Sequence, residues 1–201
     1  MNRESYDAIA AQWNAARRAA LPAERKFLAA FLVRLAPGSD VLDLGCGTGC
    51  PIATHLVAHG HRITGVDQSS AMLEFARARL PGECWVEADI KTWIPDRAYA
   101  GVVCWDALFH IERRFHETLI ARWADSLSAG GALLMSSGGS EHPPFTDIMF
   151  GHEFFYDSHP PEQLVEILQR HRFRIVLSEW IDPPTPGRDK GRFAVAASID
   201  S

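Results

Sequence analysis

The segment VLDLGCGTG, residues 41–49, constrains the fold more than any other part of the chain. It joins an apolar run that contains an acid, Asp43, to a turn with Gly45, Gly47 and Gly49. Glycine in such a turn permits positive φ and lets a ligand approach the backbone without a Cβ in the way, at an entropic cost of roughly 0.5–1 kcal/mol each relative to alanine. Three glycines therefore predict a ligand-binding turn rather than an empty bend.

Apolar runs alternate with amphipathic patterns along the chain, which predicts alternating strands and helices. The expected strands are residues 40–45, 61–67, 84–89, 100–106, 132–139, 174–182 and 192–198. The expected helices are residues 4–20, 22–38, 51–60, 69–82, 112–131 and 162–173, with a less regular stretch at 140–161 and a turn-rich one at 183–191. This order predicts an α/β fold: a doubly wound, Rossmann-like sheet of mostly parallel strands, with an antiparallel C-terminal hairpin and helices on both faces.

The length of 201 residues, 47% of them hydrophobic, favours a single domain over residues 1–201. Within it, residues 1–36 are expected to form an N-terminal helical lid or packing segment, and residues 138–158 an insertion on the substrate side. In a doubly wound sheet, ligands bind beyond the carboxyl ends of the strands. The glycine turn lies at that edge.

The spacing of the glycines separates two classes of cofactor. A dinucleotide fingerprint reads Gly-x-Gly-x-x-Gly/Ala. Counting from Gly45, its third small position would be Cys50, whereas the third glycine here is Gly49. An NAD-dependent oxidoreductase is therefore disfavoured, although it would share the fold.

The segment DLGCGTG resembles the first motif of the class I S-adenosylmethionine-dependent methyltransferase family, in its small-molecule type. The resemblance implies that S-adenosylmethionine is the cofactor and S-adenosylhomocysteine the product. It also implies that Gly45, Gly47 and Gly49 lie against the methionine part of the cofactor, with Asp43 facing its cationic amine.

Two further acids follow at strand ends, Asp67 and Asp89, so that three acids stand 24 and 22 residues apart (43 to 67 to 89). A carboxylate only accepts hydrogen bonds and can bind two ribose hydroxyls; the resemblance gives Asp67 this role, and the alternative is an acid that leads the helix at Ser69. The resemblance places Asp89 and Ile90 at the adenine. It extends less closely to Gln68, where the family often has an apolar residue.

The segment GVVCWDALFHIER resembles the fourth segment of the same family. By that resemblance Cys104 and Trp105 flank the methionine end of the cofactor, and His110 lies at the start of the next helix. A histidine suits proton transfer near neutral pH, so His110 is the candidate general base. A histidine that caps or packs the turn is an equally good interpretation.

Four aromatic or imidazole side chains are candidates for the substrate side. Tyr6 and Trp13 are seven residues apart and share one face of the first helix. His152 and Tyr156 lie in the irregular segment after the fifth strand. In each case local packing is the alternative explanation.

A small-molecule acceptor is expected, because the net charge is −5 and basic residues form no stripe, which argues against nucleic acid. The signatures of amino-methylating and cytosine methyltransferases are absent. No metal site is expected, because the four cysteines lack zinc-ribbon spacing. The sequence shows no signal peptide and no apolar run of about 20 residues, so we expect a cytoplasmic location and no membrane association. A protein that binds the cofactor without catalysis stays open, as does the oligomeric state.

Overall fold

A computed structural model describes residues 2–19, 22–185 and 191–200. Its main sheet has seven strands in the order β3-β2-β1-β4-β5-β9-β8. These are β1 (Asp40–Leu44), β2 (Arg62–Asp67), β3 (Cys84–Glu87), β4 (Tyr99–Cys104), β5 (Leu127–Ser137), β8 (Phe173–Asp182) and β9 (Arg192–Ile199). Strands β1 to β5 are parallel, whereas β9 pairs antiparallel with both β5 and β8. The predicted fold class is confirmed.

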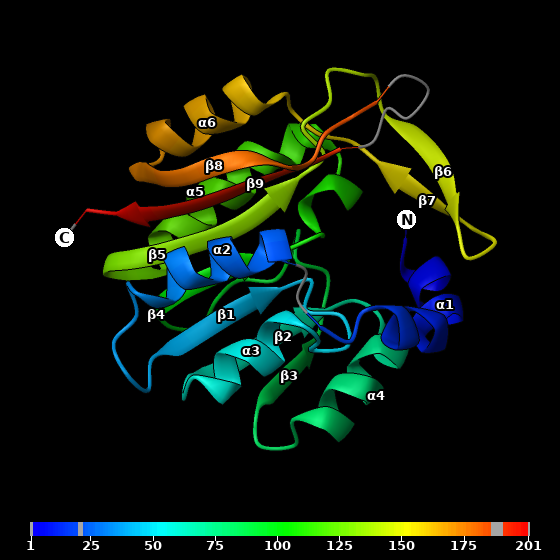
Figure 1. Cartoon of the computed structure of the whole chain (residues 1–201), viewed down its shortest axis with the longest axis horizontal. Coiled ribbons are helices and arrows are strands. Elements are labelled where there is room, and N and C mark those ends of the chain that lie inside the picture. The colour runs from blue at the N-terminus through cyan, green and yellow to red at the C-terminus, as the bar shows by residue number, and fades with distance from the viewer. Residues whose placement is uncertain (1, 20–21, 186–190, 201) are drawn as a thin grey trace.

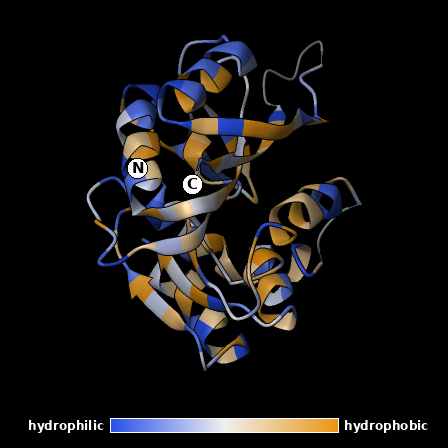
Figure 2. Cartoon of the chain, turned by 90° about the vertical axis from the view of Figure 1, so that its left-hand side faces the viewer, coloured by the Kyte–Doolittle hydropathy of each residue, from blue (hydrophilic) through white to orange (hydrophobic). Residues whose placement is uncertain are grey.

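Helices cover both faces of the sheet, and Figure 2 shows hydrophobic and hydrophilic residues along the helical ribbons. They are α1 (Arg3–Ala16), α2 (Pro22–Leu32), α3 (Ile52–Ala58), α4 (Ser70–Arg79), α5 (His116–Ser126) and α6 (Pro161–Arg170), with two 3-10 turns, η1 (Leu108–His110) and η2 (Arg113–Phe115). Apolar residues of α5 and α6 pack on one face of the sheet, and those of α2 and α3 pack on the other. Such two-sided cover explains why β1 reads as an almost continuous apolar run.

A β-hairpin and α1 lie beyond the carboxyl ends of the parallel strands, on the right-hand side of Figure 1. The hairpin consists of β6 (Phe145–Met149) and β7 (His152–Tyr156). Ile9 of α1, Met72 of α4 and Phe154 of β7 form a small apolar cluster that joins these elements. The edge of the sheet that carries the glycine turn is therefore roofed by the N-terminal helix and the hairpin.

Hydrogen bonds fix α1 in this position. The Asp7 carboxylate accepts hydrogen bonds from Ser69 Oγ (2.6 Å) and from the backbone N–H of Ala71 (3.2 Å), at the start of α4. Asn2 pairs with β7, because its Oδ1 accepts from Phe155 N (2.9 Å) and its Nδ2 donates to Phe155 O (3.0 Å). The first helix thus connects the hairpin to the body of the sheet.

Three details of the expected secondary structure are wrong. The helix expected over 112–131 ends at Ser126, and the chain from Leu127 already belongs to β5, where Leu127 pairs with Tyr99. The stretch 140–161, expected to be irregular, contains the β6–β7 hairpin. His110 also lies in η1 rather than at the start of the following helix.

The middle of the turn-rich segment, residues 186–190, lies outside the described residues. Among the residues that are described, no helix is long and apolar enough to cross a membrane. The division of the chain into one domain with a lid and an insertion stays a prediction, as does the cytoplasmic location.

Candidate active site

A cavity lies at the carboxyl ends of β1, β2 and β3, beside the glycine turn; we call it the cofactor cavity. The three strand-end acids Asp43, Asp67 and Asp89 all line it. Other predicted residues along its wall are Tyr6, Trp13, Gly45, Gly47, Gln68, Ile90, Trp105 and His110. The fold thus brings together side chains from five separate parts of the sequence.

The glycine turn has the backbone conformation that its composition predicts. Gly45, Gly47 and Gly49 all have positive φ, at 74°, 52° and 71°. A Cβ on Gly45 would lie 2.3 Å from the Cβ of Ala107, so no larger residue fits there. At Gly47 the nearest atom to such a Cβ would be Trp13 Nε1 at 3.9 Å, which places the indole of α1 over the turn.

Asp67 has two structural partners. Its Oδ2 accepts a hydrogen bond from Gly47 N (2.8 Å), and its Oδ1 accepts one from Ser69 N (2.9 Å). Burial raises the pKa of this carboxyl above its usual value, although these backbone donors act in the opposite direction. Each carboxylate oxygen has a second lone pair, so Asp67 can hold the turn and still accept from a ligand.

Asp43 is 3% exposed and lines the cofactor cavity, yet its carboxylate has no hydrogen-bond partner within the described residues. Burial, together with the nearby charge of Asp67, raises its pKa to about 7. A buried carboxylate without a partner is costly, and a cation beside it would remove that cost. The cavity therefore suits a ligand with a positive charge next to Asp43.

The other predicted cofactor residues differ in their surroundings. Asp89 lines the cavity and accepts a hydrogen bond from Lys91 N (2.9 Å). Gly49 and Cys104 are buried and do not line the cavity. Gly49 is needed for close packing instead, because a Cβ there would meet Trp85 at 3.1 Å.

A second cavity, of about 500 Å³, opens between α1, the hairpin and the end of β9; we call it the acceptor cavity. Aromatic side chains supply much of its wall: Tyr6, Trp13, Phe109, Phe145 and Tyr156. Five residues line both cavities: Tyr6, Trp13, Arg17, Asp106 and His110. The two cavities therefore meet at these side chains.

His110 is held at this junction from three sides. Its Nε2 lies 2.8 Å from Tyr6 Oη. Its Nδ1 lies 2.8 Å from Phe155 O and 2.7 Å from Asn2 Nδ2. Burial raises the pKa of Tyr6 well above its usual value, so its hydroxyl keeps its proton at neutral pH. The structure thus brings together the predicted residues Tyr6 and His110 as a hydrogen-bonded pair.

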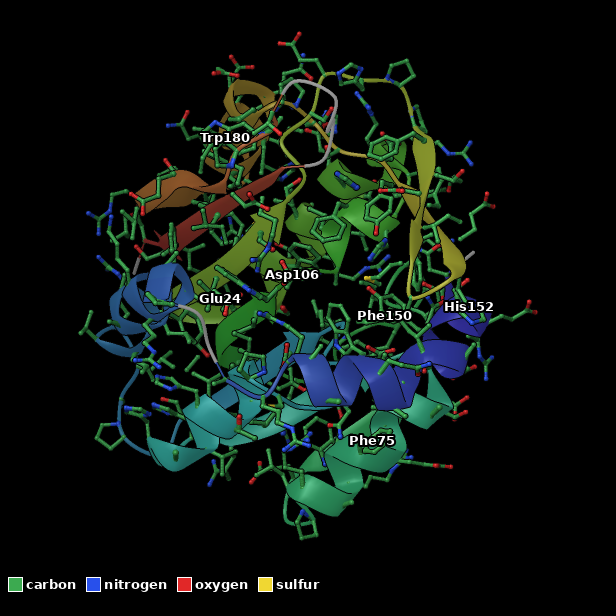
Figure 3. All side chains as sticks on the ribbon, turned by 45° about the vertical axis from the view of Figure 1, so that its right-hand side comes forward. Glu24, Phe75, Asp106, Phe150, His152 and Trp180 are labelled. Carbon is green, nitrogen blue, oxygen red and sulfur yellow. The ribbon has the colours of Figure 1, made fainter. Side chains whose placement is uncertain are left out.

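A charge cluster adjoins the junction: Glu24, which is buried, and Asp106, Arg17 and Arg192, which are half-buried. Figure 3 shows Glu24 and Asp106 close to each other near the middle of the molecule. Arg192 forms a bidentate pair with Asp106 (2.9 and 2.7 Å) and also donates to Glu24 (2.7 Å). Arg17 donates to the same two carboxylates, at 2.8 Å to Glu24 and 3.3 Å to Asp106. The two negative charges are thus matched by two positive ones.

The remaining substrate-side predictions lie in different places. Tyr156 lines the acceptor cavity. His152 is exposed at the end of the hairpin and lines neither cavity, as its label in Figure 3 also shows. Asp106 was not predicted, although it lies two residues after the end of β4, near the strand end as the other three acids are, and this signal could have identified it.

Comparisons with known proteins agree with this geometry. Residues 41–131 match the family described as "Methyltransferase domain". Trans-aconitate 2-methyltransferase of Paracidovorax citrulli is 38% identical over 115 residues, 56% of this chain and 44% of that protein. The enzyme of the same name from Delftia acidovorans is 40% identical over 134 residues, 60% of this chain and 47% of that protein. The chain thus spans less than half the length of these relatives.

Solved structures show the same fold. The DhpI complex with S-adenosylhomocysteine superposes with a TM-score of 0.71 at 21% identity, covering 98% of this chain and 94% of that one. Burkholderia thailandensis 1,6-didemethyltoxoflavin-N1-methyltransferase superposes with a TM-score of 0.67 at 21% identity, over 90% and 79% of the two chains. Residues 41–131 are therefore similar to a methyltransferase domain, and the chain shares the fold of these two solved structures. Within the part of the chain that the structure describes, no group of three or more His, Cys, Asp or Glu could hold a metal ion.

Proposed function

We propose that this chain is a methyltransferase that binds S-adenosylmethionine in the cofactor cavity and methylates a small molecule in the acceptor cavity. The observation that carries this proposal is the meeting of the two cavities at Tyr6, Trp13, Arg17, Asp106 and His110. A methyl group has to pass directly from donor to acceptor in an in-line displacement, so the two ligands must meet within van der Waals distance.

The residues of the cofactor cavity match the groups of this cofactor. Asp43, buried and without a partner among the described residues, would face the cationic amine of the methionine part. Asp67 would accept from the ribose hydroxyls, and Asp89 with Ile90 would bind the adenine. Gly45 and Gly47 leave room for the methionine part because neither carries a Cβ. The bound sulfonium would supply an already activated methyl group, so the protein has only to orient the acceptor, exclude water and accept a proton.

The same geometry favours a small acceptor. The acceptor cavity of about 500 Å³ falls within the usual size of small-molecule sites. It is roofed by α1 and the hairpin, which Asn2 and Phe155 tie together. A net charge of −5 opposes the binding of a phosphate backbone. The names of the curated relatives, trans-aconitate 2-methyltransferases, also point to a small molecule.

The proposed function is tested by measuring methyl transfer. The protein is incubated with S-adenosylmethionine carrying a labelled methyl group and with pools of small acceptors, and the release of S-adenosylhomocysteine is measured together with the label in the acceptor fraction. We expect release that depends on one of the pools. Binding of S-adenosylhomocysteine without transfer to any acceptor would instead support a protein that binds the cofactor without catalysis.

A further inference from the structure

The hydrogen-bonded pair at the junction of the two cavities defines where a proton can go during the reaction. Tyr6 Oη and His110 Nε2 are 2.8 Å apart, and both residues line both cavities. An acceptor atom placed for methyl transfer at this junction lies beside the Tyr6 hydroxyl. The tyrosine oxygen is then within reach of a proton that the acceptor carries, and the tyrosine is itself hydrogen-bonded to His110.

Two tautomers of His110 fit its surroundings. A proton on Nδ1 can be donated to Phe155 O at 2.8 Å, which leaves Nε2 to accept the Tyr6 hydroxyl. In the opposite tautomer Nδ1 accepts from Asn2 Nδ2, at 2.7 Å, and Nε2 is already protonated. When His110 is protonated at both nitrogens, its Nδ1–H can still donate to the Phe155 carbonyl, which stabilises the charged form. Asn2 is a positioning residue here, because it holds the Phe155 backbone through both its N–H and its C=O.

The shape of the acceptor cavity indicates a flat ligand. Tyr156 stacks between Phe145 and Phe109, with ring centroids 5.4 and 5.9 Å apart and interplanar angles of 17° and 28°. All three rings line the acceptor cavity. A wall of roughly parallel rings presents apolar faces on which another planar ring can stack.

The charges beside the cavity disfavour a polyanionic acceptor. Among the described residues, Arg17 and Arg192 are the arginines that line the acceptor cavity. Each donates to Glu24 and to Asp106, at distances between 2.7 and 3.3 Å. A ligand with several carboxylates would have to compete with these two carboxylates for both guanidinium groups.

From these observations, and resting on the proposed function, we infer that the acceptor is a planar aromatic molecule methylated at an O–H or N–H group, whose proton leaves through Tyr6 to His110. The bond from the acceptor atom to the methyl carbon forms as the carbon–sulfur bond breaks, and the sulfur keeps the electron pair. The acceptor proton moves to Tyr6 Oη while the Tyr6 hydroxyl proton moves to His110 Nε2. One positive charge is lost at the sulfonium and one appears on the imidazolium, so the charge balances. An aliphatic polycarboxylate such as trans-aconitate is already deprotonated at neutral pH and would need no such relay.

The experiment compares two sets of acceptors: planar phenols and N–H heterocycles in one, and aliphatic polycarboxylates including trans-aconitate in the other. We expect transfer to a member of the aromatic set. The variants Tyr6→Phe and His110→Asn should lower kcat for that acceptor by about a hundredfold, a common contribution of general-base catalysis, while the Kd of S-adenosylhomocysteine changes by less than about threefold. The matched controls are Tyr99→Phe and His59→Asn, at positions that line neither cavity.

A pH profile separates proton transfer from a merely structural role. The rate of the parent should fall on the acid side as His110 becomes protonated, and His110→Asn should lack this limb. Tyr6 and Tyr156 contact the His110 ring, and the charged groups that line the cofactor cavity with it are Arg17, Asp43, Asp67, Asp89, Lys91, Asp106 and Glu112. Tyr6→Phe retains all of these except the phenol, so it should keep the limb at a lower rate.

Three results would overturn the inference: transfer to a polycarboxylate, transfer at the parental rate by Tyr6→Phe and His110→Asn, or no transfer to either set while S-adenosylhomocysteine still binds. Loss of S-adenosylhomocysteine binding in the parent protein is a different result. It would overturn the proposed function itself.

Discussion

Asp43 offers the sharpest physical prediction, because it is a buried carboxyl whose charge the protein alone does not compensate. The side chain is 3% exposed, and burial with the nearby charge of Asp67 raises its pKa from 3.8 to about 7. The substitution Asp43→Asn preserves the size of the side chain and removes the charge. We expect it to stabilise the unliganded protein at neutral and alkaline pH.

The magnitude follows from the difference between the folded and unfolded pKa. The folded and unfolded pKa values of Asp43 differ by about three pKa units. At about 1.4 kcal/mol for each pKa unit, the ionised carboxylate lowers the stability of the folded state by at most about 4 kcal/mol. Because the folded pKa of Asp43 lies above its unfolded value, the folded state binds more protons between pH 4 and 7. Its contribution to stability is therefore fully present below about pH 4, is lost as the pH rises to about 7, and stays constant above that.

The assay is urea denaturation of the unliganded parent and of Asp43→Asn at pH 5 and pH 8. We expect the stability advantage of the variant to grow by about 2–3 kcal/mol between these two values. The matched control is Asp40→Asn on the same strand, for which the pH dependence of the stability difference should have the opposite sign. The Arg62 side chain, hydrogen-bonded to Asp40, lowers the pKa of that carboxyl, so the stability that Asp40 contributes is lost on acidification rather than gained.

The variant should also bind S-adenosylhomocysteine more weakly than the parent, since the asparagine cannot compensate a cationic amine. More stability together with less affinity is the combination expected of a functional charge. A stability difference that is the same at pH 5 and pH 8 would refute the reasoning. So would a variant that is less stable than the parent at pH 8.

Three further predictions concern the cofactor cavity and its cover. Asp67→Ala should lower the affinity for S-adenosylhomocysteine at least about tenfold in a calorimetric titration, because each hydrogen bond to a charged group contributes roughly 1.5–3 kcal/mol. Gly45→Ala should lower the melting temperature and abolish cofactor binding, since its φ is 74° and the new Cβ would lie 2.3 Å from Ala107 Cβ. Deletion of residues 1–20 should abolish methyl transfer but leave a folded sheet that keeps much of its affinity for S-adenosylhomocysteine.

Each of these has a control and an outcome that would contradict it. Because Asp67 also accepts from Gly47 N and Ser69 N, circular dichroism must show that Asp67→Ala is folded; unchanged affinity in a folded variant would leave it a structural acid. Gly38→Ala is the control for Gly45→Ala, since its φ is also 74° but a Cβ there meets nothing within 4 Å; equal effects would mean that φ alone matters. A truncated protein fully active on a protein or nucleic acid would refute the enclosed acceptor cavity.

The sequence predicts best where a structural feature is local. The glycine turn and the strand that leads into it depend on neighbouring residues and were predicted. The acids at positions 43, 67 and 89 were predicted to converge, and they line one cavity because parallel strands end at the same edge.

The errors arise where tertiary context overrides local signals. A helix was expected over 112–131, but α5 ends at Ser126, and Gly130 and Gly131 at the end of the expected helix lie inside β5. The β6–β7 hairpin was missed because its turn contains Phe150 and Gly151, both at positive φ, and Phe-Gly is not a common signal for such a turn.

The side-chain contacts at the junction of the two cavities could not be predicted from sequence patterns. Glu24 stands in the first turn of α2, yet it is fully buried and paired with Arg17 and Arg192. Asn2 lies 153 residues from Phe155, its partner in β7. Such contacts form because distant segments of the chain meet at one edge of the sheet. The spacing of residues in the sequence does not predict which segments meet there.

The central claim is that the cavity beside the glycine turn binds S-adenosylmethionine and its product. Calorimetric titration of the intact chain with S-adenosylhomocysteine, and separately with NAD, tests it most directly. We predict saturable binding of S-adenosylhomocysteine at one site and no measurable heat with NAD. Tight binding of NAD with no response to S-adenosylhomocysteine would contradict the account.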